Sequence, residues 1–214
     1  MVLPKMVYIS NATELGGIYT KSELVELRKK CDEHNLYLYM DGARIANALT
    51  CDENDLTLED ITNLTDAYYI GGTKNGILFG EALIIKNTKL KKHMRYMIKQ
   101  KGALLAKGRL LGVQFEELFR DNLYYEISKH TNQMALELRS GIKSLGYKLL
   151  IESSTNIIFV ILPNEVHKKL SKICFYEAEV PYDNKHMLAR FVTSFMTKKE
   201  DVEQLLSKLA EYKY

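Results

Sequence analysis

Two short runs decide the fold of this chain: Tyr-Met-Asp-Gly-Ala-Arg at 39–44 and Ile-Gly-Gly-Thr-Lys-Asn-Gly at 70–76. The apolar residues before Asp41 are typical of a buried strand, and this strand ends at a turn-forming glycine. A second apolar run precedes the two glycines, which let the backbone turn tightly before Lys74. Because open α/β sheets bind ligands outside the carboxyl ends of their strands, we expect Asp41 and Lys74 to meet in one site.

Strands and helices alternate around these two runs. A capping box formed by Thr20 and Glu23 predicts a helix between the first two strands. This strand, helix, strand unit predicts parallel pairing with a right-handed crossover. The alternation indicates an α/β fold with a mainly parallel sheet. We predict strands at 7–10, 36–40, 67–70 and 82–85, and a further short helix at 58–64.

The second half of the chain changes pattern. Residues 88–125 have helical, lysine-rich periodicity, and 126–145 predicts a second long helix that ends at Gly146. Beyond it the pattern predicts a smaller α+β unit without a low-complexity linker. We therefore predict two domains, 1–121 and 122–214, which share a helix and an interface. The elements predicted in the second are strands at 147–151, 156–162 and 188–193, a helix at 165–173 and a final helix with apolar residues at 202, 205, 206, 209 and 210.

The composition excludes several classes of protein. A net charge of +3 is too small to indicate a nucleic acid or an anionic membrane as partner. No apolar run approaches the roughly 18 residues that span a bilayer, and the N-terminal residues do not resemble a signal peptide. The three cysteines, Cys31, Cys51 and Cys174, have neither metal-ligand spacing nor an even disulfide count, so we predict no metal site and a cytoplasmic location.

An aspartate and a lysine at neighbouring strand ends have a specific chemical use. Pyridoxal phosphate needs a lysine amine that binds it covalently and an acidic partner that keeps its ring nitrogen protonated. Lys74 and Asp41 suit these two roles. On spacing alone, the alternative is two ordinary surface turns of an α/β protein, because glycine turns followed by charged residues are common.

The amino-acid identities in these two runs, and not only their spacing, resemble those of a known family. Together with Met-Asp-Gly-Ala-Arg-Ile-Ala-Asn-Ala at 40–48, they are similar to the low-specificity threonine aldolase and β-eliminating lyase group of fold-type I pyridoxal-phosphate enzymes. The resemblance covers essentially the whole chain, in order. It implies the remainder of a fold-type I large domain followed by a small α+β C-terminal domain. The further matching segments are 8–16, 70–76, 80–82, 101–109, 154–156 and 190–194.

The resemblance implies a role for each of five residues. Lys74 would bind the cofactor covalently and move protons at the substrate α-carbon, and Asp41 would hold the ring nitrogen. Arg44 would contact the substrate carboxylate or the cofactor, with a structural salt bridge as the alternative. Thr73 would contact the phosphate, or it would be a simple turn hydroxyl. Arg190 would clamp the α-carboxylate of an amino-acid substrate, a bidentate task that suits a guanidinium.

The reaction implied is retro-aldol cleavage of threonine or allo-threonine to glycine and acetaldehyde, with β-elimination or amino-group transfer as the alternative. The family's N-terminal portion carries several strands, a phosphate-binding turn, a histidine and a ring that stacks on the cofactor, and it has no counterpart before Val7. We therefore expect pairing with a separate N-terminal piece, a descendant without turnover, or a non-catalytic interaction protein. Because fold-type I sites lie at subunit interfaces, the resemblance also implies a homo-oligomer.

Overall fold

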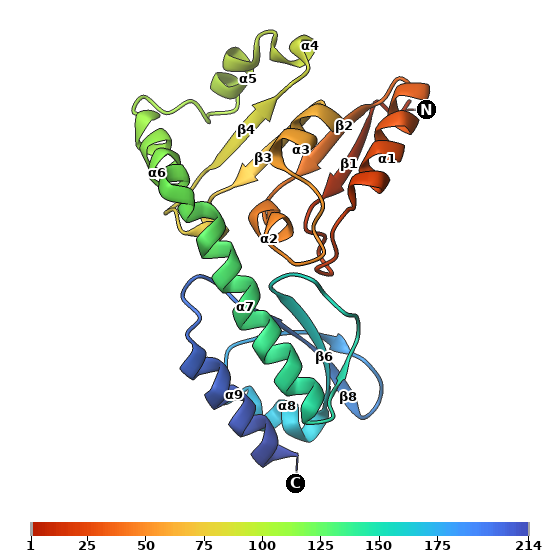
Figure 1. The fold of residues 1–214 in the computed structure, drawn as a ribbon, viewed down its shortest axis with the longest axis vertical. Helices are drawn as coiled ribbons and strands as arrows, with labels where there is room; N and C mark the ends of the chain where they lie inside the picture. Colours follow the sequence, from red (N-terminus) through yellow and green to blue (C-terminus); the bar gives the residue numbers. More distant parts are fainter. Residues whose placement is uncertain (1, 214) are drawn as a thin grey trace.

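The computed structural model describes residues 2–213, apart from the side chain of Glu179. Two sheet-containing units lie one above the other along the long axis of the molecule, and the long helix α7 (Leu123–Ser144) runs from one to the other (Figure 1). No helix in the described part of the chain is long and apolar enough to cross a bilayer.

The first unit contains a mixed, mainly parallel sheet. Its strands are β1 (Met6–Ser10), β2 (Tyr37–Asp41), β3 (Ala67–Gly71) and β4 (Glu81–Ile85), in the spatial order β1-β2-β3-β4. The first three run parallel, and β4 pairs antiparallel with β3. The predicted α/β class with a mainly parallel sheet is confirmed, and all four predicted strands are present with small shifts at their ends.

Three helices cover one face of this sheet. They are α1 (Lys21–Glu33), α2 (Ile45–Leu49) and α3 (Leu58–Leu64), and the predicted capping box of Thr20 and Glu23 starts α1. Their apolar side chains form one core with the strand residues that point the same way. The opposite face is open, since Met6, Tyr8 and Leu83 are each about half exposed.

The segment predicted as continuously helical is broken. It forms α4 (Thr88–Lys91), α5 (Met94–Gln100), α6 (Arg109–Phe119) and the short η2 (Arg120–Asn122). His93 and Gly102 adopt positive φ angles of 61° and 72°, which end regular helix on either side of α5. Neither α4 nor α5 buries a residue, so no packed apolar face extends the helix through these positions.

The second unit contains an antiparallel sheet. Its strands are β5 (Lys148–Leu149), β6 (Ile157–Pro163), β7 (Glu177–Pro181) and β8 (His186–Val192), in the order β5-β6-β8-β7. Helices α8 (Asn164–Leu170) and α9 (Lys199–Tyr212) complete the unit. Two predictions were too long, because β5 has two residues rather than five and α8 ends before residue 173. The edge strand β7 was missed.

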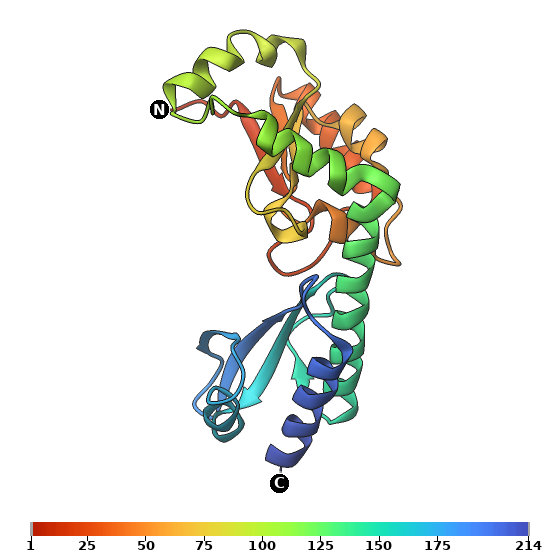
Figure 2. The same cartoon turned by 90° about the vertical axis from the view of Figure 1, so that its left-hand side faces the viewer.

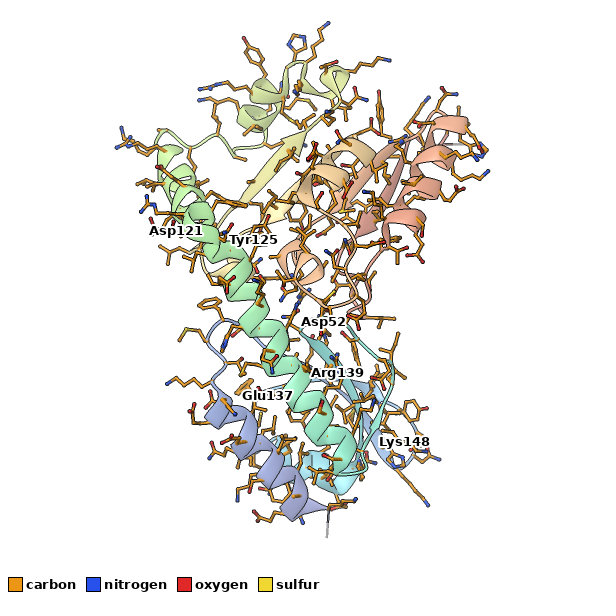
Figure 3. All side chains as sticks on the ribbon, viewed as in Figure 1. Asp52, Asp121, Tyr125, Glu137, Arg139 and Lys148 are labelled. Carbon is orange, nitrogen blue, oxygen red and sulfur yellow. The ribbon has the colours of Figure 1, made fainter. Side chains whose placement is uncertain are left out.

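Helix α7 belongs to both cores. Near its start Tyr124 is fully buried in the first core, while Met134 and Ile142 are buried in the second. Figure 2 shows the helix rising along one side of both units, and Figure 3 labels Tyr125 beside the first unit and Glu137 beside the second. The division into domains at residues 121 and 122 stays a prediction.

Candidate active site

The turns that follow β2 and β3 pack backbone against backbone. The Gly71 N–H donates a hydrogen bond to the Gly42 carbonyl oxygen at 2.9 Å. A Cβ on Gly42 would lie 1.8 Å from the Tyr69 carbonyl oxygen, and a Cβ on Gly71 would lie 2.3 Å from a carbonyl oxygen of the facing turn. Only glycine permits this approach at both positions. The interlocked turns place Asp41 and Lys74 beside each other.

Helix α7 supports the turn that carries Lys74. The Tyr124 hydroxyl donates to the Gly71 carbonyl oxygen at 3.2 Å, and the Asn75 amide donates to the same oxygen at 3.0 Å. Asn75 is itself buried and accepts a hydrogen bond from the Ser128 hydroxyl at 3.1 Å. The short η1 helix (Thr73–Asn75) is therefore fixed to α7 on both sides of the lysine.

Lys74 reaches the surface, but its amine lies among protein atoms and charges. Partial desolvation, followed by the nearby Arg44 guanidinium, lowers the pKa of Lys74. Glu14, Asp41 and Glu81 act in the opposite direction without cancelling this effect. More of the amine is therefore neutral near pH 7 than in an isolated lysine, and the neutral form is the nucleophile.

Asp41 is held by three donors. The Tyr8 hydroxyl donates to Oδ2 at 2.5 Å, the Tyr69 hydroxyl donates to Oδ1, and the Ala43 N–H donates to Oδ1 at 2.9 Å. Burial disfavours the charged form, but these hydrogen bonds and the charge of Lys74 outweigh it and lower the pKa of Asp41. The carboxylate is thus ionised and fixed at the end of β2.

Arg44 is the N-cap residue of α2, directly after the Asp41 turn. Only 9% of it is exposed, and among described residues its guanidinium makes no hydrogen bond or ion pair. Burial lowers the pKa of Arg44, and the charge of Arg190 adds to this effect. The carboxylates of Glu14, Asp41 and Glu177 act on Arg44 in the opposite direction without outweighing burial, so the partly desolvated cation lacks a direct partner. The position suits an anion that arrives from outside the chain.

Arg190 comes from β8 in the second unit and points toward the same cluster. Its Nη1 lies 2.7 Å from the Glu177 carboxylate, and its Nη2 lies 3.4 Å from that of Glu14. Its side chain is 15% exposed, and its charge acts on Arg44. The structure therefore brings together two arginines from different units, although 146 positions separate them in the sequence.

The loop that carries Glu14 bridges the two units. The hydroxyls of Ser153 and Thr155 each donate to the Gly16 carbonyl oxygen at 3.1 Å. Both donors are buried in the segment before β6. This contact fixes the loop between the β2 end and Arg190.

Thr73 lies in the lysine turn, where its hydroxyl accepts a hydrogen bond from the Gly80 N–H at 3.3 Å. Beside it, the Glu81 carboxylate accepts from the Gly72 N–H at 2.8 Å. Thr73 is exposed. These contacts close the loop between η1 and β4, and a role for Thr73 at a phosphate stays a prediction.

The structure thus gathers Asp41, Arg44, Lys74 and Arg190 into one cluster, with Thr73 on the same turn. Their roles toward a cofactor or substrate remain predictions. Sequence reasoning missed the residues that hold these side chains in place, because their contacts depend on strand register, on the loop after β1 and on α7. The missed residues are Tyr8, Glu14, Tyr69, Asn75, Tyr124, Ser128 and Glu177.

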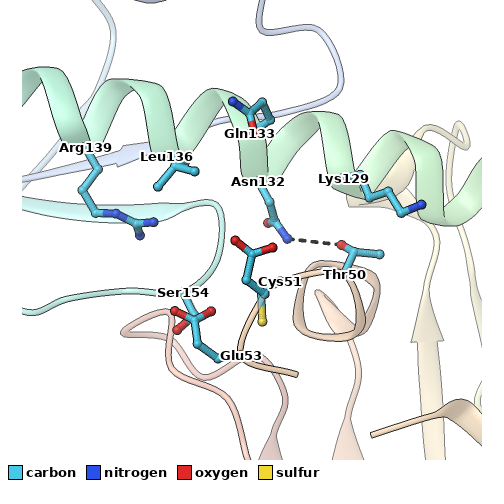
Figure 4. A pocket seen from close by; sticks show the side chains of 10 residues that line it. Thr50, Cys51, Glu53, Lys129, Asn132, Gln133, Leu136, Arg139 and Ser154 are labelled. Carbon is cyan, nitrogen blue, oxygen red and sulfur yellow. Dashed lines mark hydrogen bonds between the residues drawn. The ribbon is translucent and has the colours of Figure 1, made fainter. Parts of the chain in front are cut away.

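A separate hollow of about 250 Å³ lies between the residues after α2 and helix α7. Figure 4 shows the Asn132 amide donating to Thr50 in this pocket, at 3.2 Å. Both charge signs line it, as Glu53 and Arg139 illustrate. None of the predicted site residues lines this hollow.

A mainly parallel sheet with an aspartate and a lysine at neighbouring strand ends, followed by a small antiparallel unit, defines the fold-type I class of pyridoxal-phosphate enzymes. The sequence profile of the beta-eliminating lyase family matches residues 3–165. The chain belongs to the beta-eliminating lyase family.

Individual relatives agree with this assignment. The low specificity L-threonine aldolase of Pseudomonas sp. (strain NCIMB 10558) is 35% identical over 161 residues, which are 73% of this chain and 46% of that protein. The structure of Leishmania major threonine aldolase superposes with a TM-score of 0.97 at 46% identity and covers 99% of this chain and 62% of that one. A serine palmitoyltransferase from Sphingomonas wittichii shares the fold, with a TM-score of 0.70 at 16% identity over 98% of this chain and 54% of that one. The chain therefore spans about half the length of the curated relatives it matches.

Proposed function

We propose that this chain carries the lysine-bearing part of a pyridoxal-phosphate-dependent lyase of threonine-aldolase type. The substrate is threonine or allo-threonine, and the products are glycine and acetaldehyde. The observation that carries the proposal is the convergence of Lys74, Asp41 and Arg44 in one cluster, on turns that carry the family resemblance. The threonine aldolases among the relatives support the choice of reaction.

The residues present fit the cofactor. Lys74 offers an amine of lowered pKa, Asp41 an ionised carboxylate, and Arg44 a buried guanidinium without a described partner. Lys74 would hold the cofactor covalently, Asp41 would hold its ring nitrogen, and Thr73 would contact its phosphate. When bound, pyridoxal phosphate supplies an electron sink for the negative charge left at the substrate α-carbon.

Each protein group has its own task in this proposal. Asp41 accepts a hydrogen bond from a protonated ring nitrogen and keeps the proton there, because its own pKa is low. Arg190 and Arg44 bind the α-carboxylate of the amino acid and orient its reacting bond. Lys74, once its amine is free, accepts or returns a proton at the α-carbon.

A second candidate reaction is β-elimination, which the family's own name favours. The same aspartate and lysine would serve it, as they would serve amino-group transfer. Product analysis separates the reactions: glycine and an aldehyde indicate aldol cleavage, whereas pyruvate and ammonia indicate elimination.

The proposal includes assembly with another polypeptide. On the open face of sheet β1–β4, Met6, Tyr8 and Leu83 are exposed, and a second copy or a separate N-terminal piece would cover them. We also propose a cytoplasmic location, in keeping with three cysteines that form no disulfide. Light scattering coupled to gel filtration measures the assembly directly, and a strictly monomeric chain would exclude the second copy.

The first test is cofactor uptake by the purified chain. A visible absorbance band on addition of pyridoxal phosphate is expected for the parent and not for Lys74→Ala. Borohydride followed by peptide mass spectrometry should place the modification on Lys74, and glycine release from threonine is measured next. An identical band in the Lys74→Ala variant, or none in either protein, would refute cofactor binding by this chain and favour a non-catalytic role.

A further inference from the structure

Three tyrosines from adjacent strands form a row on the open face of sheet β1–β4. Tyr8 of β1 stacks on Tyr39 of β2, with ring centroids 5.5 Å apart, and Tyr39 lies 6.5 Å from Tyr69 of β3. The two outer tyrosines donate hydrogen bonds to Asp41, and the middle one makes none to it among the described contacts. One carboxylate is therefore held from both neighbouring strands.

The strand register explains this division. In the parallel pair, Tyr8 lies opposite Tyr39, and Ser10 lies opposite Asp41. Tyr39 and Asp41 are two residues apart on β2, so their side chains share a face of the sheet but stand one step apart along it. The Tyr8 phenol reaches forward from β1 to the carboxylate, whereas the β2–β3 register, with Met40 opposite Tyr68, brings Tyr69 level with Asp41. The ring of Tyr39 packs between the other two rings.

We propose that Tyr8 and Tyr69 are positioning residues for Asp41, which fix its carboxylate at the strand end and keep it ionised. The link to a cofactor rests on the function proposed above, whereas the effect on Asp41 itself does not. Both residues act through Asp41, not on a substrate.

The other charged groups near Asp41 cannot do this alone. Lys74 lowers the pKa of Asp41 by its charge, Arg44 interacts with it electrostatically, and Glu81 opposes them. None of the three donates a described hydrogen bond to this carboxylate. The phenols do, and the hydrogen bond to Asp41 is the main reason that the pKa of Tyr8 rises to about 12. Tyr8 is therefore a donor throughout the neutral range.

The two carboxylate oxygens are used unequally. Oδ1 of Asp41 accepts from both Tyr69 and the Ala43 N–H, whereas Oδ2 accepts from Tyr8 alone. A carboxylate oxygen has two lone pairs. Oδ2 therefore has one lone pair left to accept a hydrogen bond from a ligand, whereas both lone pairs of Oδ1 accept hydrogen bonds from the protein.

The test is a titration of Asp41 in the full chain without cofactor. Aspartate labelled with ¹³C at the side-chain carboxyl reports ionisation by NMR, and Asp41→Asn assigns the signal. Tyr8→Phe and Tyr69→Phe should each raise the titration midpoint of Asp41, and the double variant should raise it further. Tyr39→Phe is the matched control, because it keeps the ring packing and removes a hydroxyl that does not contact Asp41.

Unchanged midpoints in all Phe variants, or an equal rise in Tyr39→Phe, would overturn the proposal. If Tyr69→Phe does not fold, Tyr8→Phe carries the same test, since Tyr8 is 55% exposed. In the holoprotein the double variant should bind pyridoxal phosphate about three- to tenfold more weakly. If the Phe variants raise the titration midpoint of Asp41 but the parent chain binds no cofactor, the positioning role of the tyrosines is supported and the proposed function is refuted.

Discussion

Arg44→Met should make the ligand-free chain more stable, although it removes a residue of the proposed site. Only 9% of Arg44 is exposed and it has no described hydrogen-bond or ion-pair partner, so its charge is partly desolvated, and the carboxylates of Glu14, Asp41 and Glu177 offset this only in part. Methionine fills a similar volume, carries no charge and suits the N-terminal end of α2 no worse, because Arg44 makes no side-chain cap. Folding then no longer requires burial of a cation.

The expected gain follows from the cost of a buried polar group without a partner. That cost is about 1–3 kcal/mol, and the loss of packing by the arginine stem is largely replaced by the thioether side chain. Arginine stays protonated at every ordinary pH, so the gain should be the same at pH 6 and pH 8.

Urea unfolding of the chain without ligands measures the difference, followed by tyrosine fluorescence and far-UV circular dichroism. Arg190→Met is the control, because this arginine is paired with Glu177 and Glu14 and its loss should be neutral or cost up to about 1 kcal/mol. Destabilisation by Arg44→Met of more than about 1 kcal/mol would refute the view that Arg44 is held at a cost.

Three further predictions concern the first sheet and the lysine turn. Gly71→Ala should destabilise the chain by about 2–4 kcal/mol in urea unfolding, because the added Cβ would lie 2.3 Å from the Ala43 carbonyl oxygen; an unchanged midpoint would show that the turns separate easily. Asp66→Asn should cost about 2–4 kcal/mol at pH 7, since Asp66 forms a 2.7 Å ion pair with Arg28, and both side chains are largely buried. The pKa of Asp66 is lowered, because hydrogen bonds and Arg28 outweigh the opposing effect of burial. Its contribution is therefore present above the unfolded pKa of about 4 and is lost as pH falls through the folded value, so parent and variant should converge in acid. Lys74, whose pKa is lowered first by desolvation, should react with an amine reagent at pH 8 faster than the other exposed lysines, as peptide mass spectrometry would show; equal rates would contradict the lowered pKa.

The sequence predicted well those parts of the fold that depend on a few consecutive residues. The capping box at Thr20 and the second strand's end at Asp41 are visible in a few consecutive residues, and both are confirmed. Strand β7 was missed because Glu-Ala-Glu-Val-Pro is short and, apart from the valine, consists of residues with low strand propensity; it becomes a strand through pairing with β8. The short helix α2 was missed because its five buried or nearly buried residues have no cap and too few turns for a periodic pattern.

In the candidate site, too, some residues could be predicted from the local sequence and others could not. Asp41 and Lys74 could be predicted because each follows its own strand, and a turn displays each at a strand end. The contacts of Tyr8 and Tyr69 with Asp41 depend on register between three strands, which no single strand reveals. Long-range contacts of that kind require the assembled sheet.

Arg190 has carboxylate partners, whereas Arg44 has none among the described residues. This difference indicates which arginine contributes more to the free energy of ligand binding. Arg190 already holds carboxylates, Glu177 at 2.7 Å and Glu14 at 3.4 Å, so an arriving carboxylate exchanges one partner for another and gains little there. Arg44 gains more free energy from a bound anion, because folding already removes it from most of the solvent and anion binding adds little further desolvation cost. Arg190 then selects the orientation of the anion, while Arg44 supplies most of the attraction. On this reasoning, loss of Arg44 weakens anion binding more than loss of Arg190, even though Arg190 has the more complete set of contacts in the ligand-free chain.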